Sequence, residues 1–148
     1  MSILTNLQPQ RVFYYFEEIC KIPHGSRNVS ALVDYCVQFA EVHGLNWSRD
    51  SSDNLVMRKS GSKGYDNSDV IILQGHTDMV CEKDSDLEFD FSKDSIIPVI
   101  DGDWIHTNGT TLGGDNGIAI AMCLALLEDD SLAHPPLEVL FTSDEEIG

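Results

Sequence analysis

Apolar side chains recur every three or four positions in two segments near the start of the chain. The first stripe consists of Val12, Phe13, Phe16, Ile19 and Cys20. This spacing places apolar side chains on one face of a helix, and Pro23 ends the pattern. A second stripe, in residues 29–40, follows polar residues 26–28 that can cap a helix and precedes Gly44, which suits the position after a helix end. The pattern therefore predicts two amphipathic helices.

The segments that follow alternate between short apolar runs and turn residues. Residues 45–49 and 54–59 flank a Ser/Asp turn and predict two short strands. Residues 60–68 are rich in Gly, Ser and Asn and predict a loop. Residues 96–107 predict extended chain that turns at the Asp-Gly-Asp of residues 101–103.

A continuous apolar run, residues 70–73, and the mostly apolar residues 137–142 predict strands that are buried on both faces of a sheet. Between them, residues 117–128 predict a strongly apolar helix. Alternating helices and apolar strands predict an α/β fold with a mainly parallel sheet flanked by helices. A length of 148 residues suggests one domain, and the sequence contains no obvious interdomain linker.

The charge balance excludes several classes of partner. Nine Lys and Arg residues stand against 25 Asp and Glu residues, which gives a net charge of −16. Proteins that bind nucleic acid or anionic membranes concentrate basic residues, so we expect neither partner. The longest apolar stretch, residues 118–127, is about half as long as a membrane span, and the N-terminus does not resemble a signal peptide. Converging carboxylates would instead attract metal ions.

The four cysteines are widely spaced and form no C-x-x-C pair: Cys20, Cys36, Cys81 and Cys123. Neither a zinc knuckle nor a redox motif is indicated. We interpret them as reduced core residues of a cytoplasmic protein.

Polar residues follow the first continuous apolar run directly, as Gly75-His76-Thr77-Asp78. In extended chain, His76 and Asp78 point to the same side because one residue separates them. A neutral imidazole can bind a metal through one nitrogen while a carboxylate holds the other N–H. The alternative is a His–Asp hydrogen bond that serves structure alone.

A second polar site, Gly113-Gly114-Asp115-Asn116-Gly117, opens the apolar helix. Small residues there allow a close backbone approach, but Asp115 would repel a phosphate. A carboxylate can instead bridge two cations, because its two oxygens can bind different metals. The alternative is that Asp115 or Asn116 only caps the helix.

The third site, Asp144-Glu145-Glu146, follows the second apolar run. Adjacent acids resist burial, and metal ligation by one acid would leave its neighbour free as a general base. A solvated acidic turn is the alternative. Because open α/β sheets bind ligands where their strands end, we expect the three sites to converge.

Taken together, GHTDMV, GTTLGGDNGIAIA and FTSDEEIG resemble, in this order and spacing, the dinuclear zinc exopeptidases that include aminoacylases and co-catalytic carboxypeptidases. IPHGS, FDFSKDSIIPVIDGDWI and GTTLGGDNG are similar to the Xaa-His dipeptidase branch, also called aminoacyl-histidine or cytosol non-specific dipeptidases. The resemblance extends over residues 12–148. It departs at residues 27–30, which lack an expected acid, and at Asn108, where a basic residue is usual. These departures weaken the inference about substrate more than the reaction class.

The resemblance implies a metal site with two Zn²⁺ ions, for which Co²⁺ or Mn²⁺ could substitute. His76 would bind one ion, Glu146 the other, and Asp115 would bridge both. A cis peptide bond would join Asp115 to Asn116.

Catalytic roles are implied for two further acids. Asp78 would orient His76, and Glu145 would be the general base for the metal-bound water. The complete enzyme would hydrolyse dipeptides, with Xaa-His or broad specificity, in the cytoplasm and as a homodimer.

Each zinc normally has three protein ligands, yet residues 1–148 offer two for each ion. The resemblance places the missing Asp and His beyond Gly148, together with further strands and a lid or dimerisation domain. We therefore expect residues 1–148 to be the N-terminal part of a catalytic domain, incomplete at its C-terminal side and inactive alone. The other histidines are expected to be surface or packing residues: His24, His43, His106 and His134.

Three other functions remain open from the sequence. The same scaffold could carry a deacylase or deacetylase of N-acyl amino acids. The segment could also be a non-catalytic metal-binding or assembly module that pairs through an open sheet edge. Calcium binding by the acids of residues 84–90 meets only part of an oxygen-ligand pattern and lacks the mid-loop glycine of an EF-hand.

Overall fold

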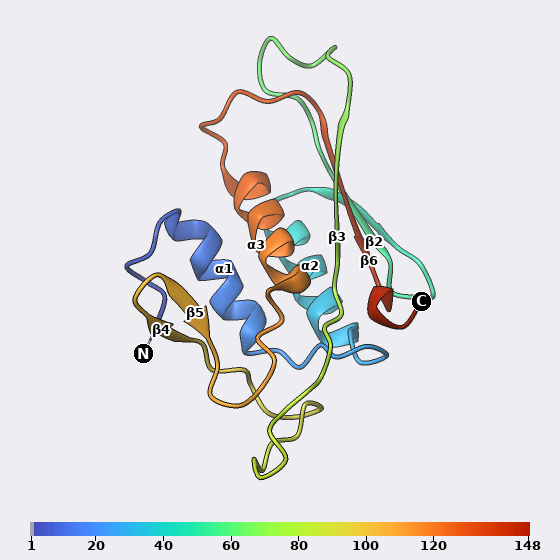
Figure 1. Cartoon of the computed structure of the whole chain (residues 1–148). Coiled ribbons are helices and arrows are strands. Elements are labelled where there is room, and N and C mark those ends of the chain that lie inside the picture. The colour runs from blue at the N-terminus through green and yellow to red at the C-terminus, as the bar shows by residue number, and fades with distance from the viewer. Residues whose placement is uncertain (1) are drawn as a thin grey trace.

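The computed structural model describes residues 2–148, in which helices cover one face of a four-stranded sheet (Figure 1). In chain order, the elements are α1 (Gln10–Cys20), α2 (Ser30–Val42), β1 (Asn46–Arg49), β2 (Leu55–Lys59), β3 (Ile71–His76), β4 (Val99–Asp101), β5 (Trp104–His106), α3 (Gly114–Glu128), β6 (Leu137–Thr142) and the short 3₁₀ helix η1 (Glu145–Ile147). The α/β class predicted from the sequence is confirmed.

Helices α1 and α2 form where the apolar stripes predict them, and Gly44 has the left-handed φ of 64° that suits a helix end. The predicted capping by residues 26–28 is wrong, because Val29 precedes α2 and no side chain caps that end. The Ser26 hydroxyl instead donates a hydrogen bond to Asp78, 52 positions further along the chain.

The sheet has the strand order β1-β2-β6-β3 and is mixed. Strands β1 and β2 pair antiparallel, as do β2 and β6, whereas β3 and β6 pair parallel. The expectation of a mainly parallel sheet is therefore wrong. The short turn between β1 and β2 permits only antiparallel pairing, and the parallel pair requires the long crossover through α3 that joins β3 to β6.

Burial of the two apolar strands on both faces is also not observed. Val70, Ile71 and Ile72 are 56%, 47% and 63% exposed, because β3 lies at the edge of the sheet and part of its surface is uncovered in residues 2–148. Strand β6 alternates, with Leu137, Val139 and Phe141 buried and the residues between them partly exposed.

The core lies between the sheet and the helices. Helix α3 approaches α1 closely at Gly117, where an added methyl group would lie 3.3 Å from the ring of Phe16. Three of the four cysteines, Cys20, Cys36 and Cys123, are buried there.

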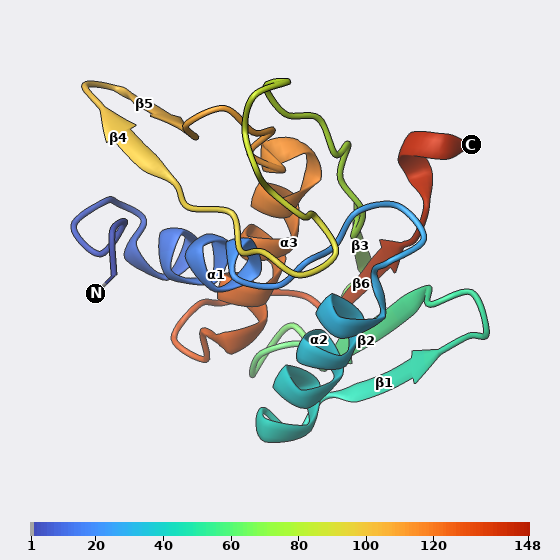
Figure 2. The ribbon, with the colours of Figure 1, turned by 90° about the horizontal axis from the view of Figure 1, so that it is seen from below.

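Strands β4 and β5 form a separate hairpin, as the Asp-Gly-Asp turn predicts, and it projects from the body of the molecule (Figure 2). In residues 2–148, no helix has the length and apolar character that a membrane crossing requires.

Candidate metal site

Three segments that are far apart in the sequence meet beside the carboxyl ends of β3 and β6. His76 ends β3, Asp115 lies at the start of α3, and Glu146 follows β6 in η1. One potential ligand atom of each side chain lies within 4.8 Å of the other two. The structure thus brings together the three residues that the motifs single out as metal ligands.

The His76 ring is buried and held at both nitrogens. Its Nδ1 lies 3.0 Å from the backbone carbonyl of Asp78, which can only accept, so Nδ1 carries the hydrogen. Its Nε2 lies 3.0 Å from Asp115 Oδ1. Burial alone would lower the pKa of His76, but the hydrogen bonds to Asp115 and to the Asp78 carbonyl outweigh it and raise the pKa above its usual value. The Asp115 carboxylate therefore favours the protonated form of His76.

The start of α3 presents the Asp115 carboxylate to solvent. Gly113 adopts a left-handed φ of 72° before the helix, and neither Asp115 nor Asn116 has helical dihedral angles. The peptide bond between them is cis, as the resemblance implies. No side chain caps this helix end by a hydrogen bond, and the Asp115 side chain is 84% exposed. Its oxygens therefore remain available for a metal.

The acidic turn after β6 directs two carboxylates toward the same place. Asp144 has a left-handed φ of 55° and precedes η1, which carries Glu145 and Glu146. The Glu145 side chain is 58% exposed, and its Oε2 lies 3.9 Å from His76 Nε2. Glu146 is the member of this pair that joins His76 and Asp115 in the cluster.

Asp78 is 1% exposed, and its carboxylate accepts three hydrogen bonds. The Ser26 hydroxyl donates to Oδ2 at 2.7 Å, and the backbone N–H groups of Glu145 and Glu146 donate at 2.9 and 3.1 Å. Burial acts to raise the pKa of Asp78, but these donors together hold it below its usual value. Asp78 Oδ1 also lies 3.4 Å from His76 Nδ1. The Asp78 side chain therefore holds the acidic turn, while its backbone carbonyl accepts the hydrogen bond from His76.

Sequence reasoning missed Ser26, although the IPHGS motif contains it. His24, two residues earlier, was expected to be a surface or packing residue, and it is packed in the interior against Gly113 and Met79. In residues 2–148, His24 Nε2 is a buried ring nitrogen without a hydrogen-bond partner. Burial lowers the pKa of His24, which keeps the ring neutral.

The remaining candidates do not join the cluster. His106 is exposed and contacts the Thr107 carbonyl, and His134 contacts the Pro135 carbonyl. In the described part of the chain, the acids of residues 84–90 form no group with metal-binding geometry; Asp90 instead contacts Ser92 and Lys93.

The donor chemistry of the cluster fits a divalent metal such as zinc. One imidazole nitrogen and carboxylate oxygens are zinc ligands in proteins, at about 2.0–2.2 Å from the ion. Zinc requires a neutral imidazole that offers an unprotonated nitrogen. Because Nδ1 carries the hydrogen and donates it to the Asp78 carbonyl, Nε2 is the nitrogen that can bind the metal. One ligand atom of Asp115 lies within 4.8 Å of a ligand atom of both His76 and Glu146.

The chain was compared with protein-family models, curated proteins and solved structures. No protein-family model matches the chain. The cytosol non-specific dipeptidase of Escherichia coli (strain K12) is 45% identical over 148 residues, which are 100% of this chain and 30% of that protein. The crystal structure of aminoacylhistidine dipeptidase from Vibrio alginolyticus has a TM-score of 0.96 and 43% identity, covering 99% of this chain and 30% of that one.

More distant structures share the fold. A tripeptidase from Staphylococcus aureus has a TM-score of 0.76 at 21% identity, over 96% of this chain and 38% of its own. The chain spans about 30% of the length of each of the two dipeptidases. Over its whole length, the chain is similar to a part of the cytosol non-specific and aminoacylhistidine dipeptidases, the branch that its motifs predict.

Proposed function

We propose that the protein carrying this chain hydrolyses dipeptides at a site with two divalent metal ions, preferably zinc. The observation that carries the proposal is the convergence of His76, Asp115 and Glu146 within 4.8 Å. Similarity to two dipeptidases supports the substrate class, since both relatives are named for this activity.

His76 Nε2 and Glu146 would each hold one ion, and Asp115 would contact both. When bound, such a pair of ions polarises the peptide carbonyl and acidifies the attacking water. Asp78 keeps the turn of Glu145 and Glu146 in place through its two backbone hydrogen bonds. These two hydrogen bonds therefore fix the backbone that carries both acids.

Glu145 would act as the general base. Its carboxylate is exposed and lies 3.9 Å from His76 Nε2, close to the ligands but outside the three-residue cluster. It would accept a proton from the attacking water and deliver it to the leaving amine, which becomes the N-terminus of the released amino acid.

A glutamine at position 145 tests this role in the full-length protein. We expect Glu145→Gln to lower kcat at least about 100-fold, the usual contribution of a general base, while zinc affinity changes less than about threefold. Glu88→Gln, in an exposed loop, is the control and should leave both quantities unchanged. Full activity in the Glu145 variant would remove the assignment.

The substrate class is tested by comparing dipeptides with N-acyl amino acids in the same metal-dependent assay. Cleavage of dipeptides that stops on chelation and returns with zinc supports the proposal. Preferential cleavage of N-acyl amino acids would assign the protein to the deacylases instead.

We further propose that residues 1–148 form part of a larger catalytic domain. Three donors give each of two ions two ligands, one fewer than a zinc site normally has. Two groups of large apolar side chains are also exposed, one at the start of β3 and one on α3; we call them together the β3–α3 surface, and they comprise Val70, Ile71, Ile72, Met122 and Leu126. Further strands and helices of the domain would cover it.

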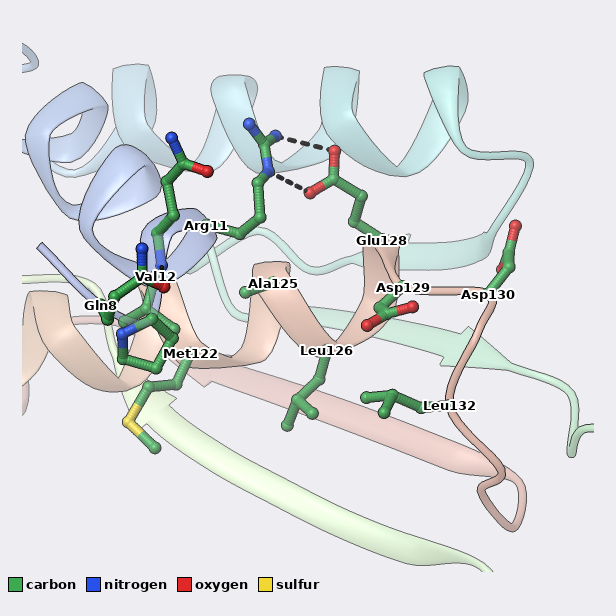
Figure 3. Close-up of a pocket in the computed structure, with 12 residues that line it drawn as sticks. Gln8, Arg11, Val12, Met122, Ala125, Leu126, Glu128, Asp129, Asp130 and Leu132 are labelled. Atoms are coloured by element: carbon green, nitrogen blue, oxygen red, sulfur yellow. Dashed lines mark hydrogen bonds and ion pairs between the residues drawn. The ribbon is translucent and has the colours of Figure 1, made fainter. Parts of the chain in front are cut away.

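Figure 3 shows one end of this surface, where Met122 and Leu126 point away from the body of α3 on the side of β3. They line a groove of about 700 Å³ together with Val12 and Leu132. The groove lies toward the far end of α3 from Asp115, so we assign it to packing and not to catalysis.

Two consequences can be measured. Residues 1–148 alone should bind zinc weakly and show no appreciable dipeptidase activity. The full-length protein should bind zinc and hydrolyse dipeptides. Stoichiometric metal without activity in the full-length protein would favour a non-catalytic metal-binding module.

We also propose that the protein acts in the cytosol, the location in the name of its E. coli relative, and that the full-length enzyme is a homodimer. Cell fractionation and sedimentation test these two points.

A further inference from the structure

The segment of residues 24–27 lies against the metal site and is held there by its main chain. Gly25 forms a β-bridge with Met79, and the Met79 N–H donates to the His24 carbonyl at 3.1 Å. These contacts fix the position of Ser26 relative to Asp78 independently of the Ser26 side chain.

The Ser26 hydroxyl completes the hydrogen bonding of a buried carboxylate. Asp78 Oδ2 accepts from Ser26 at 2.7 Å and from the Glu146 N–H at 3.1 Å. Oδ1 accepts from the Glu145 N–H at 2.9 Å. A buried carboxylate that loses a donor must find another or admit water, so removing the hydroxyl would let the carboxylate rotate.

The same segment contacts the acidic turn a second time. The Arg27 N–H donates to Asp144 Oδ1 at 2.6 Å. Residues 26 and 27 therefore hold the turn from two directions, directly at Asp144 and through Asp78 at Glu145 and Glu146.

We propose that Ser26 is a positioning residue of the metal site: its hydroxyl fixes the Asp78 carboxylate, which holds the backbone of Glu145 and Glu146 so that the Glu146 side chain stays within reach of His76 and Asp115. The effect on metal binding rests on the proposed function. The effect on the order of the turn does not, because the hydrogen bonds that produce it join protein groups alone.

Three variants of the full-length protein test the proposal. Ser26→Ala removes the donor, and Ser26→Thr keeps a hydroxyl, with room for its methyl group in the adjoining cavity of about 280 Å³. Ser131→Ala is the matched control, because the Ser131 hydroxyl donates to Asp129 at 2.6 Å just beyond the opposite end of α3.

Two quantities are measured for each variant. The first is backbone hydrogen exchange of residues 143–148 in metal-free protein, with exchange in α2 as the check that the core is folded. The second is zinc affinity, by competition with a chromophoric chelator. We expect Ser26→Ala to speed exchange of the turn and to weaken zinc binding, each about tenfold, in the range known for residues that support metal ligands. Ser26→Thr should lie within about threefold of the wild type, and Ser131→Ala should not differ.

Unchanged exchange and zinc affinity in Ser26→Ala would overturn the proposal, as would an equal loss in Ser131→Ala. Faster exchange with unchanged zinc affinity would also overturn it, because Ser26 would then order the turn without serving the metal. Failure of the proposed function has a different signature. In that case the wild type cleaves no dipeptide, while the differences in exchange and zinc affinity between the Ser26 variants persist.

Discussion

The buried carboxylates of this chain accept several hydrogen bonds each, whereas most of those proposed for metal chemistry are exposed. Asp78 and Glu17 are buried and each accepts three hydrogen bonds, mostly from backbone N–H groups. Asp115 and Glu145 are largely exposed. The difference follows from the cost of burying a charge: an enclosed carboxylate needs its donors for its own stability and has no free oxygen to offer.

Glu17 is a buried carboxylate that lies away from the metal site. Its oxygens accept from the Ser2 hydroxyl and from the N–H groups of Ile3 and Leu4, which ties the N-terminal segment to α1. Burial acts to raise the pKa of Glu17, but these three hydrogen bonds hold it below 4.5. We expect Glu17→Gln to lower the free energy of unfolding at pH 7 by about 2 kcal/mol.

The pH dependence follows from the sign of this shift. A lowered pKa in the folded state stabilises the fold fully above the unfolded value, near 4.5, and less as the pH falls through the folded value. Urea unfolding at pH 7 and pH 3 should therefore show a large difference between wild type and variant at pH 7 and a smaller one at pH 3. Glu41→Gln, an exposed change on α2, should show no such dependence. An equal difference at both pH values would contradict the assignment.

At the scale of elements, the start of α3 determines where Asp115 lies. Gly113 has a φ of +72°, and a methyl group there would lie 2.8 Å from Met79 Sδ and 3.2 Å from His24 Nε2. The turn is therefore restricted to glycine twice, by backbone conformation and by space. Gly44 has a similar φ of +64° but nothing within 4 Å, so it isolates the conformational effect.

Comparison of two alanine variants separates these effects. Gly44→Ala should lower the free energy of unfolding by about 1 kcal/mol, the cost of a left-handed alanine, and leave zinc affinity unchanged. Gly113→Ala adds overpacking, so the loss should exceed about 2 kcal/mol, and zinc affinity should fall because Asp115 shifts with the turn. Thermal unfolding and chelator competition measure both quantities. Equal losses of unfolding free energy in the two variants would mean that the Met79 and His24 side chains can move aside without cost.

The helices, and the convergence of His76, Asp115 and Glu146, could be predicted because the patterns that indicate them are local. The stripe of α1 and the motif around His76 are each read within a dozen residues. The contact between Ser26 and Asp78 could not be predicted, because 52 positions separate the two residues and nothing in either motif names its partner. The mixed sheet was missed for the same reason, since the pairing of β2 with β6 joins residues about 80 positions apart.

For the whole molecule, two forces oppose each other when copies of the isolated chain meet. At the edge of the sheet, the β3–α3 surface presents Ile71 and Ile72 of β3 and the preceding Val70, all about half exposed, and such edges associate. The net charge of −16 repels a second copy. The repulsion is screened by salt, while apolar contact is not, so self-association of residues 1–148 should increase when NaCl is raised from 0.05 to 0.5 M.

Two lysine substitutions distinguish apolar attraction from charge repulsion as the factor that controls self-association. Ile72→Lys places a charge on the apolar edge and also reduces the net charge to −15. If repulsion alone limited association, this variant would associate more than the wild type. If the β3–α3 surface is the contact, it should associate at least about tenfold less. Val42→Lys changes the net charge equally at a position that is 75% exposed on α2, outside that surface, and should behave like the wild type or associate slightly more. Sedimentation velocity of the three chains at 0.5 M NaCl distinguishes the two cases, and equal weakening by both lysines would place the contact elsewhere.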